Sequence, residues 1–249
     1  MEKPELECSM KRTKFFSLAR GLIGAGVLVA AGGALAPAAF AGATEGKQIF
    51  DAKGCANCHQ MTGPSDPLPV SQRASIKGPP LWFAGSKFKE EWLTSWLENP
   101  TPIRRVKYGA LEKGANDHAA LSAAEAADVG AYLMSLVDSE MSTGEIEEGA
   151  LSRRVAFKAE KLFTKKQVCF GCHEYPSRRG DIGGFSGPSL VKAGERLNGD
   201  WVYFLLQDNV RFYPNGRMPT YGDEAFDAYT DDELRLLAQY IAGLGAEGE

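Results

Sequence analysis

The chain of 249 residues is poor in the side chains that most often carry metal and acid–base chemistry, with three histidines and five cysteines. Its formal net charge is −4, and it has no basic cluster outside the N-terminal region, so nucleic acid is not an expected partner. No segment alternates polar and apolar residues, so the sequence gives no sign of a β-sheet. The chemistry of the protein must therefore depend on a small set of residues.

The N-terminal region has the pattern of a signal peptide. A basic segment, MKRTKFFSLAR (10–20), precedes an apolar one (21–41) that ends in Ala39-Phe40-Ala41, an A-x-A cleavage pattern. A permanent membrane anchor is the alternative, but glycine, alanine and proline make a poor spanning helix. We therefore expect residues 1–41 to be removed, with Met10 as an alternative start to Met1, leaving no membrane span. Export would place the four remaining cysteines in an oxidising compartment.

From residue 42 onward, the sequence consists of two copies of one repeat unit. Three segments of the first copy recur in the second: 46–60 as 159–175, 77–100 as 186–209, and 121–136 as 229–244. A repeat of this length predicts two tandem domains, at 42–137 and 151–249, because each copy is long enough to enclose its own core. Residues 138–150 are acidic and short of apolar residues, so they are expected to form a linker.

Each copy is predicted to be helical. The last helix of the first copy has one apolar face, formed by Val129, Tyr132, Leu133, Leu136 and Val137. A capping box begins the last helix of each copy, Ser122-x-x-Glu125 in the first and Thr230-x-x-Glu233 in the second.

Aromatic residues recur at helical spacing. The middle helix of the first copy carries Phe88, Trp92 and Trp96 at four-residue steps, and it is expected to stop before Pro100. The aromatic residue of the first helix in each copy is the expected packing partner of the tyrosine in the last helix, which gives the pairs Phe50–Tyr132 and Phe163–Tyr240.

Two C-x-x-C-H motifs lie at matching positions of the repeat, CANCH at 55–59 and CFGCH at 169–173. Two thiols on one helical turn are spaced to bond both vinyl groups of a haem, and the adjacent histidine places a nitrogen on the iron. A zinc site would use both cysteine pairs together, and a thioredoxin-like redox pair would need a βαβ pattern that is absent. We therefore predict two covalently bound haem c groups, held by Cys55, Cys58, His59, Cys169, Cys172 and His173.

The chain resembles a tandem dihaem cytochrome c, with two class I cytochrome c domains in series over residues 42–249. The resemblance rests on C-x-x-C-H, a following Gly-Pro, a later Met-Pro and a C-terminal helix with an aromatic residue. It implies an all-α fold, in which each domain is a small helical bundle around a largely buried haem. It also implies that Pro79 and Pro188 lie beside the ligand histidines, where the backbone accepts the imidazole N–H. An ordinary turn is the alternative for each Gly-Pro.

The resemblance also bears on the sixth ligand of each iron. In the second copy, NGRMPTY (215–221) is similar to the distal loop of the family, which makes Met218 the expected ligand. In the first copy, Gly109 aligns with Met218, and the loop contains no methionine. His118 lies in that loop. Some members of the family carry their distal ligand at about the same sequence distance from the last helix. We therefore expect His59 and His118 to hold haem one.

A surface histidine at position 118 is the alternative. Haem one would then take Lys107, Lys113 or a remote methionine, or would keep an open site. A bis-histidine haem usually has a lower reduction potential than a His/Met haem. With His118 bound, electrons would therefore enter at haem one and leave from haem two.

These residues favour an electron carrier or electron-transfer subunit, not an enzyme, in the periplasm. The expected partners are redox proteins, with a dehydrogenase or quinol-oxidising complex as donor and a terminal oxidase or reductase as acceptor. Two other hypotheses need an open or labile site on haem one: a peroxidase-like or sulfur-compound-oxidising enzyme, and a sensor of small gases. A thiosulfate dehydrogenase would need a cysteine as the distal ligand of the haem. The expected mature chain has no cysteine outside the two C-x-x-C-H motifs.

Overall fold

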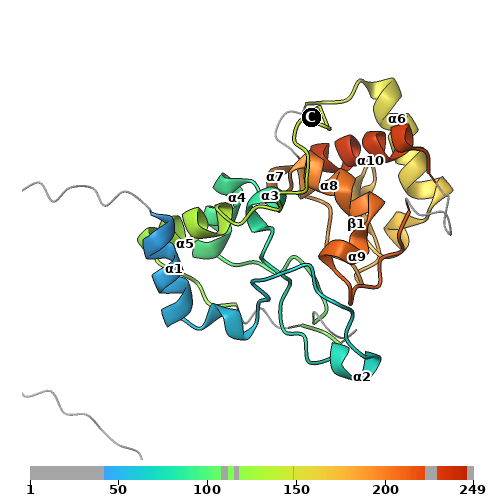
Figure 1. The fold of residues 1–249 in the computed structure, drawn as a ribbon. Coiled ribbons are helices and arrows are strands. Elements are labelled where there is room, and N and C mark those ends of the chain that lie inside the picture. Colours follow the sequence, from blue (N-terminus) through green and yellow to red (C-terminus); the bar gives the residue numbers. More distant parts are fainter. Residues whose placement is uncertain (1–41, 108–111, 115–117, 148, 222–228, 246–249) are drawn as a thin grey trace, which may run out of the picture. The chain divides into compact units, whose positions relative to one another are not determined.

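The structure is a computed structural model that describes residues 42–107, 112–114, 118–147, 149–221 and 229–245 (Figure 1). The expected signal peptide at 1–41 lies outside the described residues, and so does Gly109. Within the described ranges, no helix combines the length and the apolar character needed to cross a membrane.

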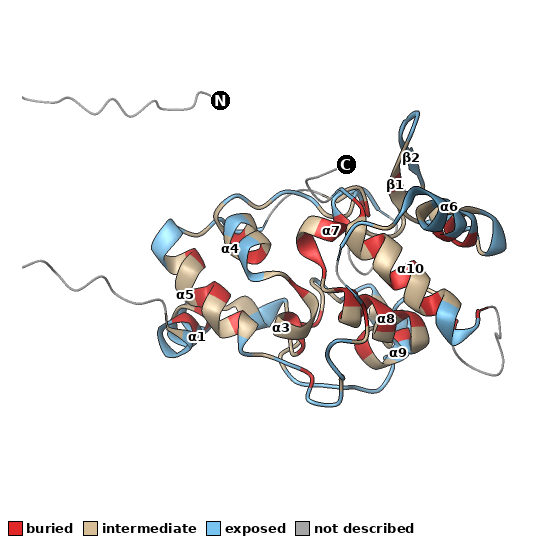
Figure 2. Ribbon diagram, turned by 90° about the horizontal axis from the view of Figure 1, so that it is seen from above, coloured by how far each residue is buried: buried red, intermediate tan, exposed pale blue. Residues whose placement is uncertain are grey.

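The described part of the first copy is built from helices: α1 (Ala43–Ala52), η1 (Cys55–Asn57), α2 (Val70–Arg73), α3 (Ala84–Lys87), α4 (Glu90–Glu98) and α5 (Ala123–Met134). Helices α1 and α5 lie side by side (Figures 1 and 2). The rings of Phe50 and Tyr132 meet edge to face with their centres 5.4 Å apart, which confirms the predicted pairing of the first and last helices. The capping box of Ser122 and Glu125 is present at the start of α5, as predicted.

One prediction for α5 is wrong. The helix ends at Met134, and Val137, assigned to its apolar face, is 59 % exposed. The physical reason is that Ser135 caps the helix, so the helical periodicity no longer applies two residues later. Val129 and Leu133 are both buried, as the periodicity predicts.

The second copy repeats this order with additions: α6 (Arg153–Lys161), η2 (Leu162–Lys166), η3 (Cys169–Gly171), β1 (Glu174–Ser177), β2 (Gly180–Gly183), α7 (Ala193–Arg196), α8 (Gly199–Gln207), α9 (Asn209–Phe212) and α10 (Asp231–Gly243). The ring centres of Phe163 and Tyr240 lie 6.1 Å apart, which confirms the predicted pair. Thr230 and Glu233 form the second capping box, also as predicted. Figure 2 shows that the buried residues of this copy gather on α7, α8 and α10.

The element η2 is a single turn of π-helix, and a one-residue insertion explains it. Phe50 precedes Cys55 by five positions, whereas Phe163 precedes Cys169 by six. A π-turn takes up one extra residue within a helix without breaking it. Both Phe163 and the second C-x-x-C-H motif therefore keep the places that their counterparts occupy in the first copy.

The short hairpin β1–β2 was not expected, since the sequence was predicted to hold no sheet. It is antiparallel, with Glu174 opposite Gly183 and Ser177 opposite Gly180. Tyr175 is the one buried residue of the two strands, so polar and apolar residues do not alternate along them. A strand pair of this kind leaves no periodic signal. The remaining described elements are helical, in agreement with the predicted all-α class.

The two copies contact each other through a shared hydrophobic core. Phe83 of the first copy is fully buried and stacks on Trp201 of the second, with ring centres 6.1 Å apart. Phe83 also meets Phe212 and Tyr213 of the second copy edge to face. Aromatic pairs of this kind add to the free energy gained by burying their area.

The segment predicted as a linker, 138–150, is attached to the second copy by polar contacts. Arg211 donates two hydrogen bonds to the Asp138 carboxylate, at 2.9 and 2.7 Å. The Asp200 carboxylate accepts from the backbone N–H groups of Gly144 and Ile146, each at 2.8 Å. These bonds fix the start and the middle of an acidic stretch that was expected to form a linker.

Candidate haem-binding sites

The two C-x-x-C-H motifs have the same local structure. Each begins with a single 3-10 turn, η1 or η3. In the first motif, the N–H groups of Cys58 and His59 donate to the carbonyl of Cys55, at 3.1 and 3.2 Å. The second motif repeats these bonds to the carbonyl of Cys169, at 3.1 and 3.0 Å. The backbone of the two motifs is therefore folded in the same way.

Both motif histidines are oriented by a backbone carbonyl. Nδ1 of His59 donates to the carbonyl of Pro79 at 2.8 Å, and Nδ1 of His173 donates to that of Pro188 at 2.8 Å. Because a carbonyl can only accept, the proton lies on Nδ1, and Nε2 keeps its lone pair for a metal. The backbone beside each histidine therefore does what the resemblance implies.

The glycine before each proline leaves space for the imidazole ring of the motif histidine. A Cβ added at Gly78 would lie 2.7 Å from Cε1 of His59, and one added at Gly187 would lie 2.6 Å from Cε1 of His173. Any side chain there would push the ring away from the proline carbonyl. The two Gly-Pro sequences are therefore parts of the histidine sites rather than ordinary turns.

Burial keeps both motif histidines in the neutral form that binds metals. Burial lowers the pKa of His59, the hydrogen bond to Pro79 opposes this change, and the nearby His118 and Lys87 lower the pKa further. Burial likewise lowers the pKa of His173, against its bond to Pro188. Neutral imidazole is the ligand form, because a protonated ring has no lone pair to donate.

His118 lies opposite His59, with the two ring centres 6.2 Å apart. A first-row metal such as zinc lies about 2.0–2.1 Å from a bound imidazole nitrogen, so two imidazoles on opposite sides of one metal have ring centres about 6 Å apart. Nδ1 of His118 donates to the carbonyl of Ala119 at 3.0 Å, which leaves its Nε2 available as well. The separation and the hydrogen bonds fit an iron held between the two rings.

Aromatic side chains support this arrangement from one side. The ring of Trp96 lies 4.7 Å from that of His118, between centres. Trp96 stacks on Trp92, and Trp92 on Phe88, at 5.9 and 5.4 Å. The middle-helix aromatics thus form a continuous row that ends at His118, although the histidine itself is exposed.

In the second copy, Met218 is partly buried and packs against the hydrophobic core. The segment that carries it is held by Asn209, a buried side chain whose amide donates to the carbonyls of Met218 and Pro219 at 2.9 and 2.6 Å. Tyr221, three residues later, is buried, and its pKa is raised to about 12 by burial and by the neighbouring Cys169 and Cys172. The Met-Pro loop therefore lies close to the second cysteine pair.

The four motif cysteines are free thiols. Among the described residues, which include both C-x-x-C pairs, no three metal-ligating side chains gather into a metal site, and neither pair is joined as a disulfide. Burial raises the pKa of Cys55 and raises that of Cys169 to about 11.

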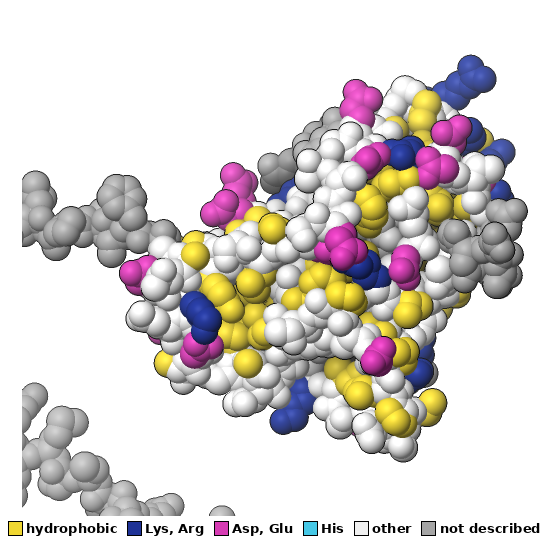
Figure 3. All heavy atoms as spheres, viewed as in Figure 1, with side chains coloured by type: hydrophobic (Ala, Val, Ile, Leu, Met, Phe, Trp, Pro, Cys, Tyr) yellow, Lys and Arg dark blue, Asp and Glu magenta, His cyan; other side chains and the backbone are white. Residues whose placement is uncertain are grey.

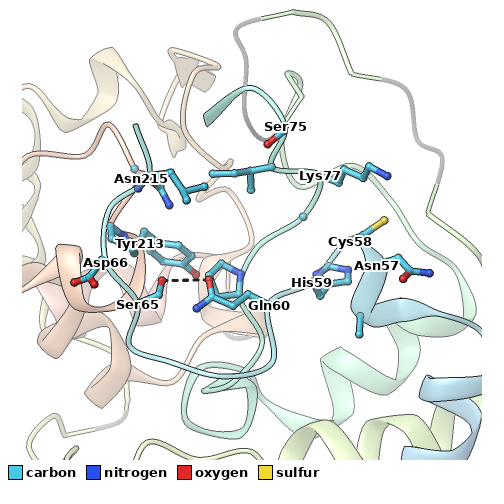
Figure 4. A pocket seen from close by; sticks show the side chains of 17 residues that line it. Asn57, Cys58, His59, Gln60, Ser65, Asp66, Ser75, Lys77, Tyr213 and Asn215 are labelled. Carbon is cyan, nitrogen blue, oxygen red and sulfur yellow. Dashed lines mark hydrogen bonds between the residues drawn. The ribbon is translucent and has the colours of Figure 1, made fainter. Parts of the chain in front are cut away.

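A cavity of about 390 Å³ opens beside the first motif. Figure 4 shows Cys58 and His59 at one end of it and Tyr213 and Asn215 of the second copy at the other. Gln60 lies between the two ends, and its amide oxygen accepts a hydrogen bond from the Ser65 hydroxyl at 3.5 Å. Because His118 is not among the residues that line it, this cavity is distinct from the space between the two imidazoles.

Arg104 and Arg105 of the first copy both contact the second copy. Arg104 donates to the carbonyl of Ser186 at 2.6 Å, and Arg105 pairs with Glu174 at 2.5 Å. Arg104 also lowers the pKa of His173. Two further cations near the histidines, Lys87 and Arg196, were not predicted, and they occupy matching places in the repeat.

Comparison with known proteins gives one family match, and it covers the first copy. Residues 43–137 match the sequence profile of the Cytochrome c family. No curated protein and no solved structure matches the chain. The matched residues include the first C-x-x-C-H motif, Gly78-Pro79 and His118, whose geometry is described above. Residues 43–137 are therefore similar to a cytochrome c domain, and this similarity suggests covalently bound haem c and a role in electron transfer.

Proposed function

We propose that the protein is an exported dihaem c-type cytochrome that transfers electrons between redox proteins of the periplasm. The observation that carries the proposal is the recurrence of one histidine arrangement in both copies. Each motif histidine donates from Nδ1 to the carbonyl of a Gly-Pro proline at 2.8 Å, and each lies next to a C-x-x-C turn. A second haem site, in the domain proposed at 151–249, follows from that match.

Bound haem c supplies a one-electron couple between ferric and ferrous iron. The chain contributes the ligands that hold and tune it. His59 and His118 would hold haem one, and His173 and Met218 would hold haem two. A methionine ligand raises the reduction potential, so haem one would have the lower potential of the two.

The surface is compatible with transient protein partners. On the face shown in Figure 3, acidic and basic side chains are interspersed, with hydrophobic side chains exposed between them. The large exposed hydrophobic side chains of the described residues include Val70, Phe157 and Phe185. Donor and acceptor proteins of the classes expected from the sequence would dock on such a mixed surface.

The proposal is tested by counting haem groups on the purified mature protein. The pyridine haemochrome assay should give two haem c per chain, and mass spectrometry should give a mature chain that starts near residue 42. The Cys169→Ala and Cys172→Ala double variant should retain one haem, on the first copy. A single haem in the wild-type protein would contradict the dihaem proposal, and strong binding of carbon monoxide to the reduced protein would favour an enzyme or a gas sensor instead.

A further inference from the structure

The helix α6 exposes a row of cations on its outer side. Residues four positions apart share one face of a helix, and the rows next to each other lie side by side. One row of α6 contains Arg153, Phe157 and Lys161, and the neighbouring row contains Arg154 and Lys158. All five side chains are exposed, and Phe157 is 52 % exposed. The outer side of the helix is therefore an aromatic ring among four cations, which we call the basic face.

The opposite side of α6 is already used by the fold. The helix packs against α10, and Ala159 is fully buried while Ala156 is half-buried. Figure 2 shows α6 at the edge of the second copy, with exposed residues along its outer side. The basic face is therefore the side of the helix that remains available to a partner.

This cluster corrects the interpretation of the sequence, which placed no basic cluster outside the N-terminal region. Residues 151–170 hold six Lys and Arg residues and one Glu, in a chain with a net charge of −4. Along the sequence, other residues separate most of these cations. Only the winding of the helix brings them together on one face.

The charges of α6 oppose the stability of the helix itself. Arg153 and Arg154 lie in the first turn, which contains no acidic residue, although the N-terminal end of a helix favours negative charge. Arg154 and Lys158 are four positions apart, and like charges at this spacing repel each other. By contrast, α4 and α10 begin with acidic residues. A charge pattern that disfavours its own helix points to an anionic partner outside the chain.

Among the described residues, no ion pair neutralises the basic face. The ion pairs of this part of the chain include Lys166, which pairs with Glu233, but none of the four cations of the face. The ammonium group of Lys161 instead lies 4.6 Å from the ring centre of Phe157. The four positive charges are therefore available to an external negative surface.

The composition of the basic face favours a lipid surface over a protein as its partner. The centre of a protein–protein interface is usually depleted of charged residues, and of lysine in particular, whereas cations make up most of this face. Helices that lie on membranes combine Lys and Arg with an aromatic side chain that enters the headgroup region, and clusters of such cations bind anionic lipids. The expected export would also bring the face close to a phospholipid membrane rather than to nucleic acid.

We propose that the basic face of α6 binds the anionic surface of a phospholipid membrane. The cations would pair with lipid phosphate groups, and the ring of Phe157 would enter the headgroup layer. The protein would then lie on the membrane without crossing it. This binding goes beyond the proposed redox function, and it does not depend on the number of haem groups.

The experiment is sedimentation of the purified mature protein with lipid vesicles. The wild type should bind vesicles of phosphatidylcholine mixed with phosphatidylglycerol, should bind vesicles of phosphatidylcholine alone much more weakly, and should be released by high salt. The double variant Arg154→Gln and Lys158→Gln should bind the anionic vesicles about thirtyfold more weakly, since each Lys or Arg near such a surface contributes about fivefold. Phe157→Ser should also weaken binding, but with the salt dependence unchanged.

The double variant Lys77→Gln and Lys113→Gln is the matched control. It removes the same charge from two exposed lysines of the first copy that form no ion pair among the described residues, so it should bind like the wild type. Equal losses in the two double variants would overturn the proposal, because net charge alone would then explain binding. A wild type that ignores anionic vesicles would also overturn it and would leave the face to an acidic protein. Haem counts of the same samples test the dihaem proposal separately.

Discussion

The imidazole rings of His59 and His118 lie with their centres 6.2 Å apart, and each ring uses Nδ1 to donate to a backbone carbonyl. The two Nε2 atoms are thereby left to bind a metal. This arrangement supports the proposal that the two histidines hold one iron. It would also give six-coordinate iron to a domain with no methionine in its distal loop.

The first prediction follows from this pair. His118→Ala should remove one ligand and leave haem one with an open site, while the haem count stays the same. The reduced variant should then bind carbon monoxide at about one haem per chain, measured by the change in its Soret absorption. Lys113→Ala is the control, since Lys113 is a ligand only under the competing hypothesis. Carbon monoxide binding that appears with Lys113→Ala and not with His118→Ala would reverse the assignment.

The second prediction concerns the glycine beside His173. Gly187→Ala places a methyl group 2.6 Å from Cε1 of the ring, so the imidazole must move away from the Pro188 carbonyl. Overpacking of this kind costs about 1–3 kcal/mol in the free energy of unfolding. Denaturant unfolding would measure the loss.

Gly243→Ala is the matched control for this change. Gly243 is the last residue of α10, and an added Cβ there meets no atom within 4 Å. Alanine is the better helix former, so this variant should be neutral or slightly stabilised. Equal effects of the two substitutions would argue against close packing of Gly187 on the histidine.

The third prediction concerns Asn209, the residue that holds the segment of Met218. Asn209→Ala removes the donor to two carbonyls and should cost about 1–3 kcal/mol, because those buried acceptors lose their bonds. The methionine-to-iron band in the near infrared should weaken with it. Asn215→Ala is the control, since Asn215 instead accepts a hydrogen bond from the N–H of Leu68. A band unaffected by the loss of Asn209 would mean that other contacts position Met218.

The fourth prediction concerns pH. Burial opposes ionisation of Asp138, but the hydrogen bonds from Arg211 and the N–H of Glu140, with the charge of Arg211, outweigh it and lower the pKa of Asp138. A carboxylate with a lowered folded pKa stabilises the fold above its unfolded pKa, and the contribution is lost as the pH falls through the folded value. Asp138→Ala should therefore cost about 1.5–3 kcal/mol at neutral pH.

Unfolding measured from pH 7 down to below pH 4 would test this. The gap between the wild type and Asp138→Ala should narrow as the pH falls below about 4, the usual aspartate pKa. Asp51→Ala, which breaks an exposed pair with Lys47, should leave the stability unchanged at every pH. A gap that is constant over the whole range would show that the ionised form of Asp138 is not what stabilises the contact.

Much of each site could be predicted from the sequence because it depends on local spacing. The C-x-x-C-H turns and the capping boxes of Ser122 and Thr230 follow from residues close together or repeated in register. The place of Pro79 beside its histidine was implied by the family resemblance. The matching aromatic residues of the two copies also predicted the pairing of Phe50 with Tyr132, and helical periodicity predicted the buried face of α5. It failed at Val137, where a cap ended the helix.

The remaining features depend on contacts between distant residues, and a single sequence carries little signal for them. Lys87 and Arg196 lie 109 positions apart in the sequence, and neither segment contains a pattern that predicts a contact of the cation with the other copy. The hairpin β1–β2 lacked alternation, and the π-turn η2 needed the alignment of the two copies. The identity of the second copy as a haem domain remains a proposal, since the family match covers residues 43–137.

The most direct test of the central claim is a spectrum of the oxidised, purified protein in the near infrared and by electron paramagnetic resonance. The account predicts two low-spin haem signals, one typical of paired imidazoles and the other of histidine with methionine. It also predicts one methionine-to-iron band for every two haem groups. A high-spin signal from one of the two would contradict the pairing of His59 with His118 and would move an enzyme or a gas sensor ahead of an electron carrier.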